Sequence, residues 1–377
     1  MDDVLELDNL DKLRIDNNIN SLKENDIPYL KYMVRVPVNA LTEIISEEEI
    51  INKLLVDYLI ACSASLMISS QVFLIGDLLD KINKKYNTDK ILSIEDKTII
   101  INIVNKLYTL SELEEFSMRL ESVNVCLWVL GYISDIDSYN RCSVDSINKI
   151  LFKCRDYNDL LKLSSMRTKE EILSKFDLIT RYYWAFREID DEKLALKLNE
   201  NIVEIQNETF EFITSYSYDS LRNKNIKIEY EKDDIEFNFE IPTFLSFERL
   251  SEKSKELVAL KSDDGSSRIV FTDLGRIDIS EFESKVEKNV NLFVKNGFKV
   301  IGDYELHSTL LEEKIIRIII SRANVSINTY YIYVSNHLIR IDSLIEPFID
   351  GANYEENIKS KNTNLDMDII FSIREFN

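Results

Sequence analysis

Two sets of polar and aromatic residues in this sequence have the types and spacing to form a chemical site. The first set is Glu121, Asn124 and Trp128, spaced i, i+3 and i+7. The second set is Asp177, Arg181, Trp184 and Glu188, spaced i, i+4, i+7 and i+11. Residues at these spacings share one face of a helix. Facing each other, the two sets would combine carboxylates for acid–base work, a guanidinium for an anionic group and two indole rings.

These sets admit two interpretations. In the functional one they line a polar cleft, where Arg181 binds an anionic group of a ligand and Glu121 acts as acid or base. In the structural one they form a buried network of ion pairs and amides, with Asp177 and Arg181 as an i,i+4 pair and the tryptophans packed between helices. We favour the structural interpretation, because charges interleaved with tryptophan at helical spacing usually fix packing. A solvent-reachable cavity near Arg181 and Trp184 would favour the functional one.

Other catalytic and metal-binding patterns do not occur in the sequence. Both histidines, His307 and His337, lie in the C-terminal half, so Ser–His or Cys–His chemistry in the first half has no local base. No GxSxG, Walker A or Rossmann pattern is present. The cysteines have no CxxC spacing and lie far from the histidines, which argues against zinc; they are Cys62, Cys126, Cys142 and Cys154. We expect no catalytic residue, metal or cofactor, although a hydrolase that uses carboxylates alone stays open.

The charge of the chain bears on its partners. The 377 residues carry 46 Lys and Arg against 67 Asp and Glu, a net charge of -21, and the acidity extends over both halves. Such a field disfavours nucleic acid and anionic membrane surfaces, and it suits a basic partner or simple solubility. The start Met1-Asp2-Asp3-Val4 has no signal-peptide character. With the unpaired cysteine pattern, this predicts a reducing, cytoplasmic location.

The first half has the start signals and periodicity of an all-α bundle, which we assign to residues 1–220. Capping boxes at Ser46-Glu47-Glu48-Glu49, Ser111-Glu112-Leu113-Glu114 and Thr168-Lys169-Glu170-Glu171 predict helix starts. The predicted helices run from Ser46 to about Ile60 and on to Leu79 as a second helix, from Ser111 to Leu130, from Thr168 to Ile189 and from Asp191 to Ser215. The uncharged stretch from Tyr58 to Gly76 is interrupted by serines, so we expect a core helix rather than a membrane span. Asp135-Ile136-Asp137, followed by Asn140, lacks the glycine and final glutamate of a calcium loop and is predicted to be a turn.

The second half, residues 221–377, alternates with the period of strands. The predicted strands are 226–230, 235–239, 257–260, 268–271, 298–306, 314–322, 326–334 and 338–341, with a hairpin turn at Asp263-Asp264-Gly265. An amphipathic helix from Ile279 to Lys295 ends at Asn296-Gly297, and a short helix is predicted from Asp366 to Phe376. The fold class is therefore α+β, a helical bundle followed by an antiparallel α+β domain. Ile315–Ile320 is so apolar that it predicts either a groove for a partner helix or strand, or a sheet buried on both faces, one of them by the bundle.

Three segments of the helical part form a recognisable set. They are Ser117-Met118-Arg119-Leu120-Glu121-Ser122-Val123-Asn124-Val125-Cys126-Leu127-Trp128-Val129-Leu130-Gly131, Asp177-Leu178-x-x-Arg181-Tyr182-Tyr183-Trp184-Ala185, and Ser46-Glu47-Glu48-Glu49-Ile50. Together they resemble motifs of the bacterial Domain of Unknown Function 4272 (DUF4272) family, over roughly residues 20–215. The chain departs from the family pattern at Met118, where the family has tryptophan, and at Tyr183, where it has histidine. The family has no established activity, so the resemblance implies a relative without a function.

The strand and helix order of the C-terminal half is similar to that of the DcrB, PsbP and Mog1-like fold. Members of that group are mostly non-enzymatic binding modules, including chaperones for secreted bacterial effectors. We therefore expect a non-catalytic, cytoplasmic protein-interaction module of the immunity or effector-chaperone type, with a basic or hydrophobic protein as partner. The alternative is an enzyme or small-ligand-binding protein that uses a cleft of Glu121, Asn124, Trp128, Asp177, Arg181 and Trp184.

Overall fold

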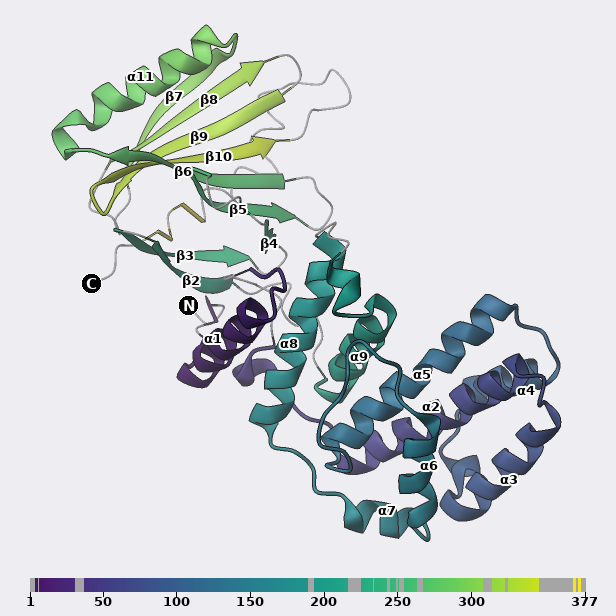
Figure 1. The fold of residues 1–377 in the computed structure, drawn as a ribbon. Coiled ribbons are helices and arrows are strands. Elements are labelled where there is room, and N and C mark those ends of the chain that lie inside the picture. Colours follow the sequence, from purple (N-terminus) through teal and green to yellow (C-terminus); the bar gives the residue numbers. More distant parts are fainter. Residues whose placement is uncertain are drawn as a thin grey trace. The chain divides into compact units, whose positions relative to one another are not determined.

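The computed structural model in Figure 1 describes most of the chain. The described residues are 4–5, 7–30, 37–188, 193–215, 225–232, 234–242, 245–248, 250, 254–262, 267–307, 314–322, 325–345, 369–370 and 372–373. They belong to two units. The helical unit comprises residues 8–29 and 36–217, and the sheet unit comprises residues 218–377 together with 1–7 and 30–35. The N-terminal residues that the sequence assigned to the helical part thus group with the sheet unit, because β1 (Val4–Leu5) pairs in parallel with β2 (Asn225–Lys232).

The helical unit is formed by helices of seven to twenty-two residues. They are α1 (Asn9–Glu24), α2 (Glu47–Ile68), α3 (Phe73–Tyr86), α4 (Ile94–Val104), α5 (Leu110–Val129), α6 (Val144–Lys153), α7 (Tyr157–Leu163), α8 (Lys169–Glu188) and α9 (Glu200–Ile213), with 3-10 turns at Asn39–Leu41, Thr88–Lys90 and Leu194–Leu196. The α2 and α5 helices pack along each other, and α9 packs against both α5 and α8. The all-α class predicted for this half is confirmed.

Reciprocal capping boxes begin several of these helices. Ser46 and Glu49 satisfy each other's amides at the start of α2, as predicted. At α5 the predicted position was wrong by two residues, because Thr109 rather than Ser111 caps the helix and exchanges hydrogen bonds with Glu112. Both Thr109–Glu112 and Ser111–Glu114 have the i,i+3 spacing of a capping box. Only Thr109 and Glu112 form one in the structure.

Three further helix boundaries differ from their predictions. The predicted break near Ile60 does not exist, since α2 continues to Ile68, and the second helix, α3, runs from Phe73 to Tyr86 instead of ending at Leu79. The serines of α2 do not stop it: the Ser65 hydroxyl donates to the Ala61 carbonyl oxygen at 2.8 Å, one turn back, and Ser63 is buried inside the helix packing. The α9 helix begins at Glu200, capped by Asn199, and not at Asp191. The α2 helix is long and apolar enough to cross a membrane, but 72% of that window is buried in the protein, which fits the predicted core helix.

The sheet unit contains a three-stranded sheet of order β1-β2-β3 and a seven-stranded antiparallel sheet of order β4-β5-β6-β10-β9-β8-β7. The further elements are β3 (Ile235–Pro242), β4 (Leu245–Phe247), β5 (Glu256–Ser262), β6 (Ser267–Arg276), a 3-10 turn (Ile279–Glu281), α11 (Phe282–Lys295), β7 (Lys299–His307), β8 (Lys314–Arg322), β9 (Val325–Val334) and β10 (His337–Ile345). The predicted strands and the helix ending at Asn296-Gly297 are confirmed. The turn at Asp263-Asp264-Gly265 and most of the helix predicted from Asp366 lie outside the described residues.

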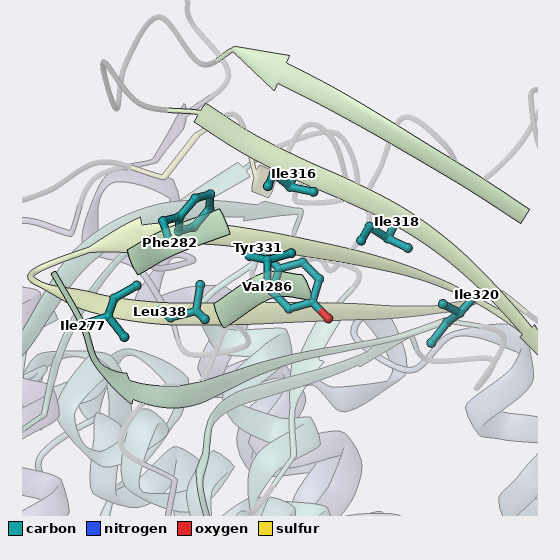
Figure 2. Packing of buried hydrophobic residues seen from close by; sticks show 8 residues of the cluster. All are labelled: Ile277, Phe282, Val286, Ile316, Ile318, Ile320, Tyr331 and Leu338. Carbon is teal, nitrogen blue, oxygen red and sulfur yellow. The ribbon is translucent and has the colours of Figure 1, made fainter. Parts of the chain in front are cut away.

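Side chains from α11 and the sheet form the core of this unit on one face of the large sheet. Figure 2 shows Phe282 and Val286 of α11 with Ile316, Ile318 and Ile320 of β8, whose alternate positions all point to this face. Ile277, Tyr331 and Leu338 complete the cluster.

The opposite face is also covered within the sheet unit. Phe237 of β3 stacks on Phe271 of β6, with ring centroids 6.0 Å apart, and Phe239 packs against the same ring at a tilt, at 5.1 Å. Ile315 and Ile319 are buried. Burial on both faces agrees with the second prediction for Ile315–Ile320. On this face β3 contacts β6 and β9 of the large sheet.

Candidate functional site

The predicted ion pair of α8 exists and is sealed from solvent. Arg181 Nε donates to Asp177 Oδ2 at 3.1 Å, and neither side chain has any exposed surface. Asn18 of α1 donates its Nδ2 to the same carboxylate oxygen at 2.7 Å and to the Ser174 carbonyl oxygen at 2.9 Å. The i,i+4 pair is therefore joined to a buried amide that ties α1 to α8, as the structural interpretation expects.

Glu121 is equally buried, and it holds a loop in place. Its Oε1 accepts the Cys142 backbone N–H at 2.8 Å, and the Cys142 thiol donates to the Leu120 carbonyl oxygen at 3.2 Å. Only 1% of Glu121 is exposed, and burial raises its pKa. The carboxylate thus fastens the C-terminal end of the 131–143 connection to the middle of α5.

Replacing Glu121 by glutamine should change how stability depends on pH. An acid with a raised pKa binds its proton more tightly in the folded chain, so its contribution to the free energy of unfolding falls as pH rises above the ordinary value of 4.5. Glu121→Gln removes this loss, so the free energy of unfolding of the variant, relative to that of the wild type, should rise as pH increases above 4.5, measured by urea unfolding.

The control for that prediction has the opposite sign. The hydroxyl and amide of Thr109 lower the pKa of Glu112. The free energy of unfolding of Glu112→Gln, relative to that of the wild type, should therefore fall as pH rises. Differences that stay constant with pH for Glu121→Gln would show that burial does not govern this carboxyl.

Trp128 anchors the other end of the same connection through Arg167. The Arg167 guanidinium lies 4.4 Å above the indole ring, its Nε donates to the Trp128 carbonyl oxygen at 2.9 Å, and one terminal nitrogen donates to the carbonyl oxygens of Ile133 and Ser134 at 3.0 Å each. On its other side Trp128 contacts Phe210 of α9 edge-on at 6.0 Å. The ring therefore serves packing and loop attachment.

The two predicted sets do not meet in one cleft. The α9 helix packs against both α5 and α8, and its Phe210 contacts Trp128 of α5 and stacks on Phe176 of α8 at 5.7 Å. In the described part of the chain, no hydrogen bond or ion pair links Glu121 to Asp177 or Arg181. The charged members of the two sets thus belong to separate networks.

The remaining predicted residues lie at the edges of these networks. Asn124 and Trp184 are partly buried, and no hydrogen bond among the described residues joins their side chains to the other candidates. Tyr183, at the position of the family histidine, accepts a hydrogen bond from Arg187 at 3.2 Å. Whether any of the six predicted residues binds a ligand stays a prediction.

A third network, centred on the buried Asp57, was not predicted. Asp57 of α2 binds Lys53 at 2.9 Å, Arg119 at 3.3 Å and the hydroxyl of Ser122 at 2.7 Å. Lys53 and Asp57 are spaced i,i+4 on α2, and Arg119 and Ser122 are spaced i,i+3 on α5. The spacing alone could therefore have indicated one polar face on each helix. Only the packing of α2 on α5 shows that they form one network.

Gly131 brings the 165–167 segment against the end of α5. Its φ is +77°, and a Cβ atom at this position would lie 2.3 Å from the Ser165 carbonyl oxygen. The backbone N–H groups of Ser165 and Arg167 donate to the carbonyl oxygens of Leu130 and Val129, both at 2.9 Å. Glycine is required here by both the backbone conformation and the close approach.

The connection after Gly131 lines a pocket of about 420 Å³. The predicted turn is confirmed, since Asp137 Oδ1 accepts the N–H groups of Tyr139 and Asn140 at 2.7 and 3.1 Å. Gln206 of α9 donates to the Asp137 carbonyl oxygen and accepts from the Ser138 hydroxyl, both at 2.8 Å. The pocket is lined by Asp135, Ile136, Asp137, Ser138, Tyr139, Lys175, Tyr182, Lys197 and Leu198.

The thiols and the described histidine are poorly placed for nucleophilic chemistry. Burial raises the pKa values of Cys62 and Cys126 to about 12. At the start of β10, His337 Nδ1 hydrogen-bonds with Asp273 at 3.0 Å, and Nε2 lies 3.2 Å from a carboxylate oxygen of Asp234. The side chain of His307 lies outside the described residues.

A different kind of feature lies on α3, α4 and the start of α5. Large apolar side chains are exposed there: Phe73 (78%), Ile94 (84%), Ile101 (56%), Leu107 (68%) and Leu110 (60%). Ile94 and Ile101 are two turns apart on one face of α4. Both α3 and α4 pack against α2, and these five exposed residues are together called the α3–α4 apolar surface.

Comparison with known proteins gives one family and a distant structural likeness. A family model described as "Domain of unknown function (DUF4272)" matches residues 14–221. None of the curated proteins matches. Among solved structures, cyanobacterial PsbP (CyanoP) from Synechocystis sp. PCC 6803 matches with 10% identity and a TM-score of 0.29, over 40% of this chain and 92% of that one. This likeness is of the kind noted for the C-terminal half, and at such a score it carries no functional argument.

Proposed function

The chain belongs to the DUF4272 family, whose description assigns no activity, and we propose that it is a non-catalytic protein-interaction module that binds its partner through the α3–α4 apolar surface. A cytoplasmic immunity or effector-chaperone role would suit such a module. The observation that carries the proposal is the exposure of Phe73, Ile94, Ile101, Leu107 and Leu110. Large apolar side chains gathered on the surface of a soluble protein commonly mark interaction sites.

The burial of the charged candidates supports a non-catalytic module. Glu121, Asp177 and Arg181 are exposed by 1% or less, and each charge is used in a contact between helices or with a loop. A general acid or anion-binding group must reach its substrate. The enzyme or ligand-binding alternative based on these residues would require α8 or α5 to open.

Charge complementarity indicates the chemistry of the partner. The first turn of α4 carries Glu95 and the first turns of α5 carry Glu112, Glu114 and Glu115, all exposed, within a chain of net charge -21. Exposed lysines, among them Lys97 and Lys106, lie between them, so residues 73–115 carry eight acidic and six basic side chains. We therefore assign the surface to an amphipathic helix with an apolar face and basic margins. The excess of acidic side chains would favour such a helix over an acidic one.

Two synthetic helices with the same leucine face test this assignment, one with lysine margins and one with glutamate margins. We expect the lysine peptide to bind at least tenfold more tightly in fluorescence anisotropy. The double substitution Ile94→Asp, Ile101→Asp should weaken binding at least tenfold, because it places charge on the apolar face.

The matched control is Leu196→Asp, a change at a residue that is 74% exposed on a different part of the helical unit. It should leave the affinity unchanged. Equal binding of both peptides, or equal loss with the control variant, would refute this assignment of the surface.

A further inference from the structure

The 135–139 pocket has walls fixed from three sides by residues that also serve the helix packing. Glu121 holds Cys142, Arg167 holds Ile133 and Ser134, and Gln206 holds Asp137 and Ser138. A loop fastened at both ends and in the middle keeps its shape without a ligand, which lowers the entropic cost of binding one. The α3–α4 apolar surface involves none of these residues.

The size and lining of the pocket suit a small polar molecule with an apolar part. Its volume of about 420 Å³ falls within the range of small-molecule sites, roughly 300–1,000 Å³. Lys175, Lys197, Asp135 and Asp137 give it equal numbers of positive and negative side chains, while Ile136 and Leu198 are buried apolar groups. Tyr139 and Tyr182 add phenol groups.

Two of the four charges are committed to the protein. Asp137 accepts backbone N–H groups of its own turn, and Lys197 Nζ donates to the carbonyl oxygens of Asn25 and Asp26 at 2.6 and 3.1 Å. Lys175 and Asp135 pair with each other at 2.8 Å across the pocket lining, and the Asp135 Oδ1 atom of this pair also accepts the Ile136 backbone N–H at 2.9 Å. The Asp135 side chain is 76% exposed, and an ammonium group with one such contact retains two N–H donors.

A close Lys–Asp pair selects against ligands with a single charge. Any such ligand that approaches its opposite partner also meets a like charge about 3 Å away, so attraction and repulsion largely cancel. A molecule that carries both charges can align antiparallel to the pair and gain from each end. We propose that the pocket binds a small zwitterion of the amino-acid or dipeptide class, with its carboxylate on Lys175 and its ammonium group on Asp135.

Matched probes distinguish the zwitterion from its halves. We would titrate the full chain with L-leucine and the dipeptide Gly-Leu, and with isopentylamine and 4-methylpentanoate, which keep the apolar part and only one charge each. Isothermal titration calorimetry should give saturable binding for at least one zwitterion and at least tenfold weaker binding for both single-charge analogues. No saturable binding by either zwitterion, or equal binding of an analogue, would overturn the proposal.

Substitutions locate the binding on the protein. Lys175→Met and Asp135→Asn should each weaken zwitterion binding at least tenfold, while Lys149→Met, at an exposed lysine of α6, should leave it unchanged. Tyr182→Phe removes one hydroxyl from the lining with little risk to folding, and a shift in affinity would place the ligand in this pocket. Full affinity in both Lys175→Met and Asp135→Asn would place the ligand elsewhere and contradict the assignment.

Discussion

Replacing Arg181 by methionine should lower the free energy of unfolding by about 3–5 kcal/mol, the usual cost of breaking a buried ion pair from one side. The substitution leaves the Asp177 carboxylate fully buried, with the Asn18 amide but without its guanidinium. Urea unfolding followed by tryptophan fluorescence measures this loss. Both tryptophans, Trp128 and Trp184, belong to the helical unit, so the signal reports on that unit.

The double substitution Asp177→Leu, Arg181→Met is the control. Replacing a buried pair by apolar residues of similar volume is often nearly neutral, so the double variant should be more stable than Arg181→Met alone. If the single variant lost less than about 1 kcal/mol, the pair would not be the sealed contact that its zero exposure indicates.

Replacing Gly131 by alanine should destabilise the helical unit by about 2–4 kcal/mol, the sum of a strained positive φ and a steric overlap. The added methyl group would meet the Ser165 carbonyl oxygen, which belongs to the backbone and cannot rotate away. The hydrogen bonds that join Ser165 and Arg167 to the end of α5 should weaken with it. The same urea experiment measures the effect.

Gly76 offers a matched comparison. It lies inside α3, and a Cβ atom there would have no neighbour within 4 Å. Gly76→Ala should therefore stabilise the chain by about 0.5–1 kcal/mol, the helix-propensity difference between the two residues. Equal effects of the two substitutions would mean that the contact with Ser165 is not tight.

Local signals in the sequence were sufficient for much of the fold. The box of Ser46 and Glu49 and the alternation around Phe237 are properties of a few neighbouring residues, and both predictions held. The continuation of α2 past Ile60 depended instead on its packing against α5, which overrides the weak helix preference of serine. Boundaries decided by tertiary packing were therefore misplaced.

In the candidate site too, the sequence predicted the local contacts but not the long-range ones. The contact between Asp177 and Arg181 follows from their spacing, but Asn18 reaches the carboxylate from 159 residues away. Helical periodicity gives the face on which Glu121 lies, yet not that α9 separates this face from α8. Contacts between residues far apart in the sequence depend on which helices pack beside each other. The spacing of residues within one helix does not reveal this arrangement.

The pairing of β1 with β2 has a consequence for synthesis on the ribosome. The partners of Val4 and Leu5, Asn225 and Ile226, are translated about 220 residues later. At about 5–20 residues per second, these N-terminal residues wait roughly 10–40 s for a strand to join. The helical unit can fold in that interval, whereas the sheet unit closes only after its own C-terminal strands appear. A fusion tag placed before Val4 would therefore hinder the folding of the sheet unit rather than that of the helical unit.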